Sequence, residues 1–125
     1  MLAESRSRGQ AVRRGEIYKI DLSHGRSGHE TQGERPAIIF SNDVFNGNAS
    51  WKTVIVIPVT TSVSQARRSY GVVLPAGSAG LPSESVALCH QITTIDRDRI
   101  GALYGQLDAR LLRSVEDEVR TILRL

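Results

Sequence analysis

Hydrophobic and polar positions divide most of the chain into short β segments. Residues 17–22 alternate between the two types, which is typical of a half-buried strand. Residues 36–40 and 53–59 are nearly continuous β-branched runs, which indicate strands buried on both faces. Residues 71–74 and 85–89 indicate two further strands. Five or six strands of this length predict a small, strongly bent barrel.

Three connections separate these predicted strands. The twelve residues after the first strand contain Gly25, Gly28 and Gly33, and loops of that length in compact domains are uncommon and often functional. Residues 41–52 carry three Asn and one Gly, which predicts a surface connection. Residues 75–82 consist largely of turn residues.

The end of the chain changes to a helical period. Asp108 can cap a helix, and an apolar stripe follows it at helical spacing: Leu111, Leu112, Val115, Val119, Ile122 and Leu123. We expect this helix to pack on the barrel, which gives a mainly β, α+β fold. The charged side chains fall mostly on the other face, which we expect to be solvated: Arg110, Arg113, Glu116, Asp117 and Arg120.

Charge is concentrated near the N-terminus. The chain of 125 residues has a formal net charge of +3 and a sequence pI near 9.5, which would ordinarily favour a nucleic-acid partner. Residues 1–14 hold four of the 16 basic residues and one of the 13 acidic residues, so the remainder is neutral. We interpret residues 1–12 as a disordered basic arm and residues 13–125 as one domain. RNA binding must therefore rest on the local placement of charge.

Composition excludes several other classes. Cys89 is the only cysteine, so no intrachain disulfide can form, and a free thiol suits a reducing compartment. His24, His29 and His90 lack partners at zinc-like spacing, so we expect no metal and no cofactor. No apolar stretch approaches the roughly 18 residues of a membrane span, and the N-terminus lacks a signal-peptide pattern. We expect a cytoplasmic protein that does not bind membranes.

Arg35 is the first candidate for chemistry. It stands before Pro36 at the start of a buried strand, at the end of the glycine-containing loop that holds Glu30. RNA can be cleaved by attack of its own 2′-hydroxyl if a base removes that proton and a cation stabilises the charge on phosphorus. The planar fork of arginine can hold two phosphate oxygens. Alternatively, Arg35 is a loop residue paired with Glu30 or Glu34.

A second polar cluster follows the apolar strand at residues 53–59. Thr60, Thr61 and Ser62 place three consecutive hydroxyls where that strand leaves the core. These hydroxyls can simply bond the backbone at the end of the strand. Alternatively, Thr60 holds a phosphate oxygen beside Arg35.

Taken in order, five segments of the chain resemble the MazF/PemK toxin family. They are Arg14-Gly15-Glu16-Ile17-Tyr18, the loop at residues 28–36, Ala37-Ile38-Ile39-Phe40-Ser41-Asn42-Asp43, Pro58-Val59-Thr60-Thr61-Ser62, and residues 85–95. An Asp-initiated turn and a C-terminal helix complete the likeness, which covers residues 13–125. The order of the segments is more specific than any one of them.

The resemblance implies a homodimeric SH3-like barrel of the CcdB/PemK type with a C-terminal helix. It also implies the toxin of a type II toxin–antitoxin pair, a metal-independent endoribonuclease that cuts single-stranded RNA, including mRNA, at short sequences. The products would carry 2′,3′-cyclic phosphate and 5′-hydroxyl ends. Arg35 and Thr60 match the family's catalytic pair, and Glu30 matches a position sometimes assigned as general base. A MazE-like antitoxin with a flexible acidic tail would cover Arg35, and contact with DNA would be indirect, through that antitoxin.

Two departures limit what the resemblance transfers. Thr31 follows Glu30, so Gln32 sits one place later than in common family loops, although the spacing from Glu30 to Arg35 is unchanged. Some members carry a histidine immediately before the arginine, where this chain has Glu34. Proton-transfer schemes that use that histidine therefore do not apply here, and a role for the nearby His29 is open.

Sequence preference should come from loops that hold unstacked bases. We expect RNA contacts from polar side chains and from one aromatic ring, Trp51, which either stacks on a base or packs against protein. Gln91 matches a position near the substrate groove of the family. The candidates for RNA binding are Gln32, Asn42, Asn46, Asn48, Thr61, Ser62, Arg67, Arg68 and Gln91.

Two other functions remain possible on sequence grounds. The same barrel serves CcdB-like toxins, which bind gyrase and have no nuclease activity, but such a protein does not need the pair Arg35 and Thr60. A non-catalytic SH3-like adaptor for nucleic acids is less favoured, because the domain outside the arm carries no net positive charge.

Overall fold

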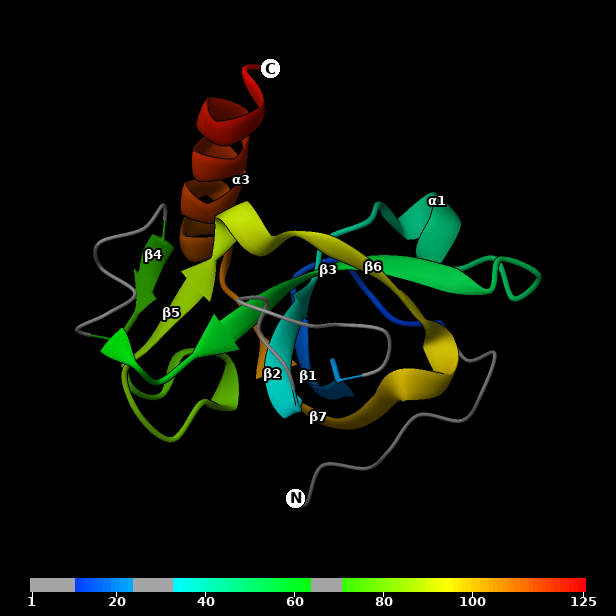
Figure 1. Cartoon of the computed structure of the whole chain (residues 1–125), viewed down its shortest axis with the longest axis horizontal. Coiled ribbons are helices and arrows are strands. Elements are labelled where there is room, and N and C mark those ends of the chain that lie inside the picture. Colours follow the sequence, from blue (N-terminus) through cyan, green and yellow to red (C-terminus); the bar gives the residue numbers. More distant parts are fainter. Residues whose placement is uncertain (1–10, 24–32, 64–70) are drawn as a thin grey trace.

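The computed structural model describes residues 11–23, 33–63 and 71–125 (Figure 1). Within these ranges the chain forms strands and short helices, with one long helix, α3 (Ala109–Leu123), at the end. The strands are β1 (Glu16–Asp21), β2 (Glu34–Ile39), β3 (Thr53–Thr60), β4 (Gly71–Leu74), β5 (Ser85–Leu88), β6 (Thr93–Asp96) and β7 (Ile100–Gln106). The short helices are α1 (Asp43–Asn46) and the 3-10 turns η1 (Ser78–Gly80), η2 (Cys89–Gln91) and η3 (Arg97–Arg99).

The strands form one antiparallel sheet in which β3 has the central position. The order is β4-β5-β3-β2-β1-β7, and β6 also pairs with β3. Along one edge β3 changes partner, because its residues 53–56 pair with β6 whereas Val59 and Thr60 pair with β5. Pro58, which has no N–H to donate, lies at this change. β3 therefore crosses the molecule and belongs to both halves of the sheet (Figure 1).

Alternation along the strands produces a core on each face of the sheet. Ile17, Ile38 and Ile57 lie in one cluster, which also contains Val115 and Val119 from α3. The neighbouring positions on the same strands, among them Tyr18 and Ile39, lie in a second cluster. β2 and β3 are thus apolar on both faces, as their continuous apolar runs predict.

The predicted mainly β, α+β fold is confirmed, but the predicted strand number was too low. The strand predicted at residues 71–74 matches β4, and those predicted at 17–22, 53–59 and 85–89 agree with β1, β3 and β5 to within one residue at each end. β2 begins two residues before the strand predicted at 36–40. The described residues contain seven strands instead of five or six. The additional strands are β6, which has only four residues, and β7, whose two glycines weaken its strand signal.

The helix at the C-terminus begins as predicted. Asp108 is its N-cap and accepts a hydrogen bond at Oδ1 from the Leu111 N–H at 2.8 Å. Val115 and Val119 are buried against the sheet, whereas Leu123 at the end of the predicted stripe is 49% exposed. The apolar stripe therefore ends before the helix does.

Val12, in the first described segment, packs into the core. Residues 1–10 lie outside the described part, so the predicted arm stays a prediction, but Val12 is 2% exposed and belongs to the second core cluster. Arg14, which we counted with the basic N-terminus, donates to Glu116 on α3 at 2.7 Å and to the carbonyl of Phe40. Glu116 is therefore a tether to the sheet rather than part of a solvated face.

Candidate active site

Arg35 and Thr60, the two principal candidates, lie on neighbouring antiparallel strands. β2 and β3 pair as Ala37 with Pro58, Ile38 with Ile57 and Ile39 with Val56. Arg35 and Thr60 each stand two residues beyond the last of these pairs, Ala37 with Pro58, near the ends of the two strands. Directly opposite residues of an antiparallel pair point to the same face, with their Cβ atoms about 5 Å apart. If the pairing of β2 and β3 continued by two residues, Arg35 and Thr60, 25 positions apart in sequence, would lie opposite each other, and we expect the two to form one site.

Arg35 is exposed and follows a tight entry into β2. Gly33 has a φ of +85°, a conformation that favours glycine, and its carbonyl accepts from the Leu22 N–H at 2.9 Å. On its other side Arg35 pairs in register with Ile20 of β1. Glu34, which precedes Arg35, lies 3.8 Å from Lys19 in an ion pair whose members are both more than half exposed. Such a pair contributes little to stability.

Of the two roles that the sequence left open for Thr60, the structure shows the backbone contact. It is half-buried, and its Oγ1 accepts a hydrogen bond from the Ser62 N–H at 3.1 Å. That bond is the backbone contact expected at the end of a strand. A hydroxyl that accepts at oxygen still has its own proton to donate. The bond to Ser62 therefore orients the oxygen without using the proton that a phosphate oxygen would accept.

The neighbouring hydroxyls Thr61 and Ser62 are both exposed. Gln91 is half-buried in η2, the turn that joins β5 to β6 and so passes β3 where β3 changes partner. Its predicted place near the substrate groove stays a prediction. Four of the predicted site residues lie outside the described part of the chain: Glu30, Gln32, Arg67 and Arg68. The same is true of His24 and His29.

The connection between β2 and β3 is more ordered than a plain surface loop. It contains α1, which Asn42 caps by accepting from the N–H groups of Val44 and Phe45 at 2.9 and 3.1 Å. Asn46, predicted to contact RNA, is fully buried and bonds Ser41 through its Oδ1 and Nδ2. That prediction was wrong, because both ends of its amide are used inside the protein. Asn42 and Asn48 are exposed.

Arg97 is the residue of this region that the sequence did not reveal. It is 6% exposed and donates to the backbone carbonyls of the connection at Phe45, Asn46, Asn48 and Trp51. Burial lowers the pKa of its guanidinium, which nonetheless stays charged because arginine titrates far above neutrality. In sequence Arg97 stands between two aspartates, as is typical of a solvated turn, so nothing in the neighbouring residues indicates that it is buried.

Cys89 is buried at the centre of the first core cluster. Burial, and to a lesser extent the charge of Glu118, raises its pKa to about 12. Since the thiolate is the reactive form, we expect no reaction of native Cys89 with a thiol reagent at pH 8 and rapid reaction after unfolding in urea. Absorbance of the released thiol-reagent chromophore checks this, and labelling of the native protein at the unfolded rate would contradict it.

Neither a metal site nor a membrane helix is found in the described residues. Within residues 11–23, 33–63 and 71–125, no group of three or more His, Cys, Asp or Glu side chains is placed to hold a metal ion. Over the same ranges, none of the helices has the length and apolar character to cross a membrane.

In the described part of the chain, the antiparallel sheet of seven strands and the C-terminal helix define a class of small, mainly β proteins. The sequence matches the family described as PemK-like, MazF-like toxin of type II toxin-antitoxin system over residues 13–123. The chain belongs to this family.

Individual relatives agree with this assignment. The chain is 33% identical over 114 residues to the endoribonuclease EndoA of Bacillus subtilis, covering 91% of this chain and 96% of that protein. It is 32% identical over 117 residues to the endoribonuclease MazF9 of Mycobacterium tuberculosis, covering 91% and 98%.

Solved structures support the fold. MazF from Deinococcus radiodurans superposes with a TM-score of 0.77 at 23% identity, covering 92% of this chain and 98% of that one. A mycobacterial endoribonuclease in complex with its cognate antitoxin superposes with a TM-score of 0.68 at 22% identity, covering 92% and 95%. At these identities the likeness establishes the architecture.

Proposed function

We propose that this protein is the toxin of a type II toxin–antitoxin pair, a homodimeric endoribonuclease that cuts single-stranded RNA in the cytoplasm at short sequences without a metal ion. The observation that carries this proposal is the match to the PemK-like, MazF-like toxin family over residues 13–123, in a fold whose neighbouring strands β2 and β3 carry Arg35 and Thr60. Relatives named endoribonucleases at 32–33% identity over most of the chain favour this activity over gyrase binding.

The proposed reaction is an internal transesterification. The 2′-oxygen attacks the adjacent phosphorus, its proton passes to a base, and the bond from phosphorus to the 5′-oxygen breaks with protonation of that oxygen. The products are a 2′,3′-cyclic phosphate and a 5′-hydroxyl. Negative charge grows on the non-bridging oxygens during attack, so groups that hold those oxygens lower the barrier.

Arg35 and Thr60 supply such groups. The exposed Arg35 side chain carries a planar guanidinium fork that can bind two phosphate oxygens. The Thr60 hydroxyl donates to one of the same oxygens while Ser62 holds its oxygen in place. Glu30 is the proposed base, although an unperturbed glutamate with a pKa near 4.3 is a weak one.

For Thr60→Ala we expect kcat to fall by about tenfold or more with the fold retained, because one hydrogen bond to the developing charge is lost. Thr60→Ser keeps the hydroxyl and is expected to restore most of the rate. Single-turnover cleavage of a labelled RNA measures both. Near-normal activity of Thr60→Ala would show that Thr60 has no catalytic role and serves only to accept the hydrogen bond from Ser62.

The test of the proposed function is an assay of purified protein on single-stranded RNA with EDTA present. We expect cleavage at a short, recurring sequence and no cleavage of the same sequence in a duplex. Intact single-stranded RNA, or cleavage that depends on added Mg²⁺, would contradict the proposal.

An antitoxin with an acidic tail would inhibit by pairing its carboxylates with Arg35. A synthetic acidic peptide from the cognate antitoxin is therefore expected to raise the apparent KM for RNA, and more so at low salt. A peptide that changes neither binding nor cleavage of RNA would exclude this form of inhibition.

A further inference from the structure

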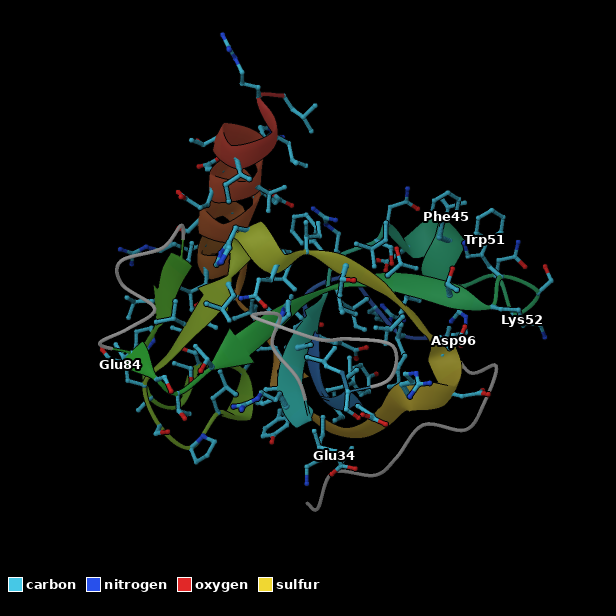
Figure 2. The ribbon with its side chains drawn as sticks, viewed as in Figure 1. Glu34, Phe45, Trp51, Lys52, Glu84 and Asp96 are labelled. Carbon is cyan, nitrogen blue, oxygen red and sulfur yellow. The ribbon has the colours of Figure 1, made fainter. Side chains whose placement is uncertain are left out.

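An exposed aromatic pair lies at the end of β3 remote from Thr60. The rings of Phe45 and Trp51 are parallel to within 4° with centroids 4.8 Å apart, and the two residues are 40% and 45% exposed. Figure 2 shows them side by side near the start of β3, close to Lys52 and well apart from Glu34 at the start of β2. Stacking at this separation is a favourable geometry for aromatic rings.

The backbone beneath this pair is fixed by Arg97. Its buried guanidinium donates to the carbonyls of Phe45 at 2.9 Å, Asn46 at 3.0 Å and Asn48 at 3.2 Å, and also to that of Trp51. These bonds tie both aromatic residues to one planar group. The pair is therefore a preorganised surface, and binding to it requires little additional ordering.

We propose that the Phe45–Trp51 pair binds an unpaired base of the single-stranded RNA whose phosphate is held by Arg35 and Thr60. This inference rests on the proposed function. Aromatic side chains are the usual partners of unstacked bases, and stacking tolerates any base because every base has a π face. Lys52, exposed directly after Trp51, is placed to contact the phosphate backbone.

A base fits this surface better than the apolar face of a protein partner does. Val44 is the only other large exposed hydrophobic residue near the pair in the described part of the chain, because Leu123 and Leu125 lie at the far end of α3. The surroundings are instead polar, with Asn42, Asn48 and Ser50 exposed. A stable protein interface buries roughly 800 Å² on each partner around an apolar centre, which is far more than these rings supply.

The distance to the active site determines how the pair should act. β3 rises about 3.3 Å per residue, so its eight residues separate Trp51 from Thr60 by more than about 20 Å. The bound base is therefore several nucleotides from the cleaved bond. Loss of the pair should raise KM for long RNA, leave kcat unchanged, and have no effect on an RNA too short to span β3.

Trp51 is the only tryptophan, so its fluorescence reports on this surface directly. The probe is a single-stranded RNA of about 12 nucleotides, fully 2′-O-methylated to prevent attack by the 2′-oxygen. We expect it to quench the emission of the wild-type protein. Trp51→Ala should bind the probe about tenfold more weakly, and Trp51→Phe, which keeps a ring, should retain most of the affinity. Val44→Ala is the matched control, since an exposed aliphatic side chain offers no ring.

Three results would overturn the proposal. One is unchanged emission on binding, and another is unchanged affinity of Trp51→Ala. The third is a fall in sedimentation mass for Trp51→Ala or Val44→Ala with unchanged RNA affinity, which would assign the surface to contact between two copies of the chain. Cleavage of unmodified RNA without quenching by the probe would reject the stacking surface and leave the proposed function standing. Quenching by the probe without cleavage of unmodified RNA would support the stacking surface and reject the proposed function.

Discussion

Replacing Arg35 with alanine is expected to lower kcat for RNA cleavage by about 100- to 1000-fold. The guanidinium would hold the non-bridging oxygens most strongly when they carry the most charge, so its loss raises the barrier for the chemical step. A change confined to KM would instead indicate a group that binds substrate and transition state equally. Single-turnover kinetics at saturating enzyme separates the two.

Two variants make this result specific to the geometry of Arg35. Arg35→Lys keeps the positive charge but loses the planar fork, so we expect only a small part of the rate to return. Arg110→Ala removes an exposed arginine from α3 and should leave the rate unchanged. Because Arg35 is itself exposed, its variants should keep the wild-type circular dichroism spectrum and melting temperature. Wild-type cleavage by Arg35→Ala would remove Arg35 from the proposed mechanism.

Arg97→Ala is expected to reduce the free energy of unfolding by about 3 kcal/mol. The variant leaves up to four backbone carbonyls without their charged donor and opens space in a buried region, and each such loss typically costs about 1–3 kcal/mol before water compensates. A domain of this size should melt about 10 °C lower. Urea denaturation followed by circular dichroism measures the change.

The matched control for Arg97 is Arg120, which pairs with Asp117 at 3.4 Å on the surface of α3. Both side chains are more than 60% exposed, so Arg120→Ala should change stability by less than about 0.5 kcal/mol. If the two variants were equally stable, the bonds of Arg97 to the connection between β2 and β3 would contribute nothing measurable.

Most of the framework followed from local sequence pattern. The apolar runs of β2 and β3 and the apolar stripe of α3 are long enough to identify these elements from their period alone. Asp108 is the N-cap of α3, as its capping chemistry predicts. β7 escaped detection because its apolar residues are interrupted by Gly101 and Gly105. α1 escaped detection because a helix of four residues has no period to recognise, although Asn42 is a typical cap.

The site followed from sequence only in part. Arg35 and Thr60 were identified from their chemical type and from the family resemblance, whereas their relative position depends on the pairing of β2 with β3, which no single strand encodes. The misassigned Asn46 and the unrecognised Arg97 share a cause. Both are polar residues in loop-like sequence that turn inward to bond backbone groups of distant or neighbouring segments, and burial of this kind is visible only in three dimensions.

The most direct test of the central claim uses two versions of one RNA that the protein is found to cut, both incubated with EDTA. In the second version, the nucleotide on the 5′ side of the cut carries a 2′-deoxyribose. We predict that mass spectrometry detects 2′,3′-cyclic phosphate and 5′-hydroxyl ends from the first version and that the second stays intact. Cleavage of the deoxy version at the same bond, or products with 3′-hydroxyl and 5′-phosphate ends, would contradict the account.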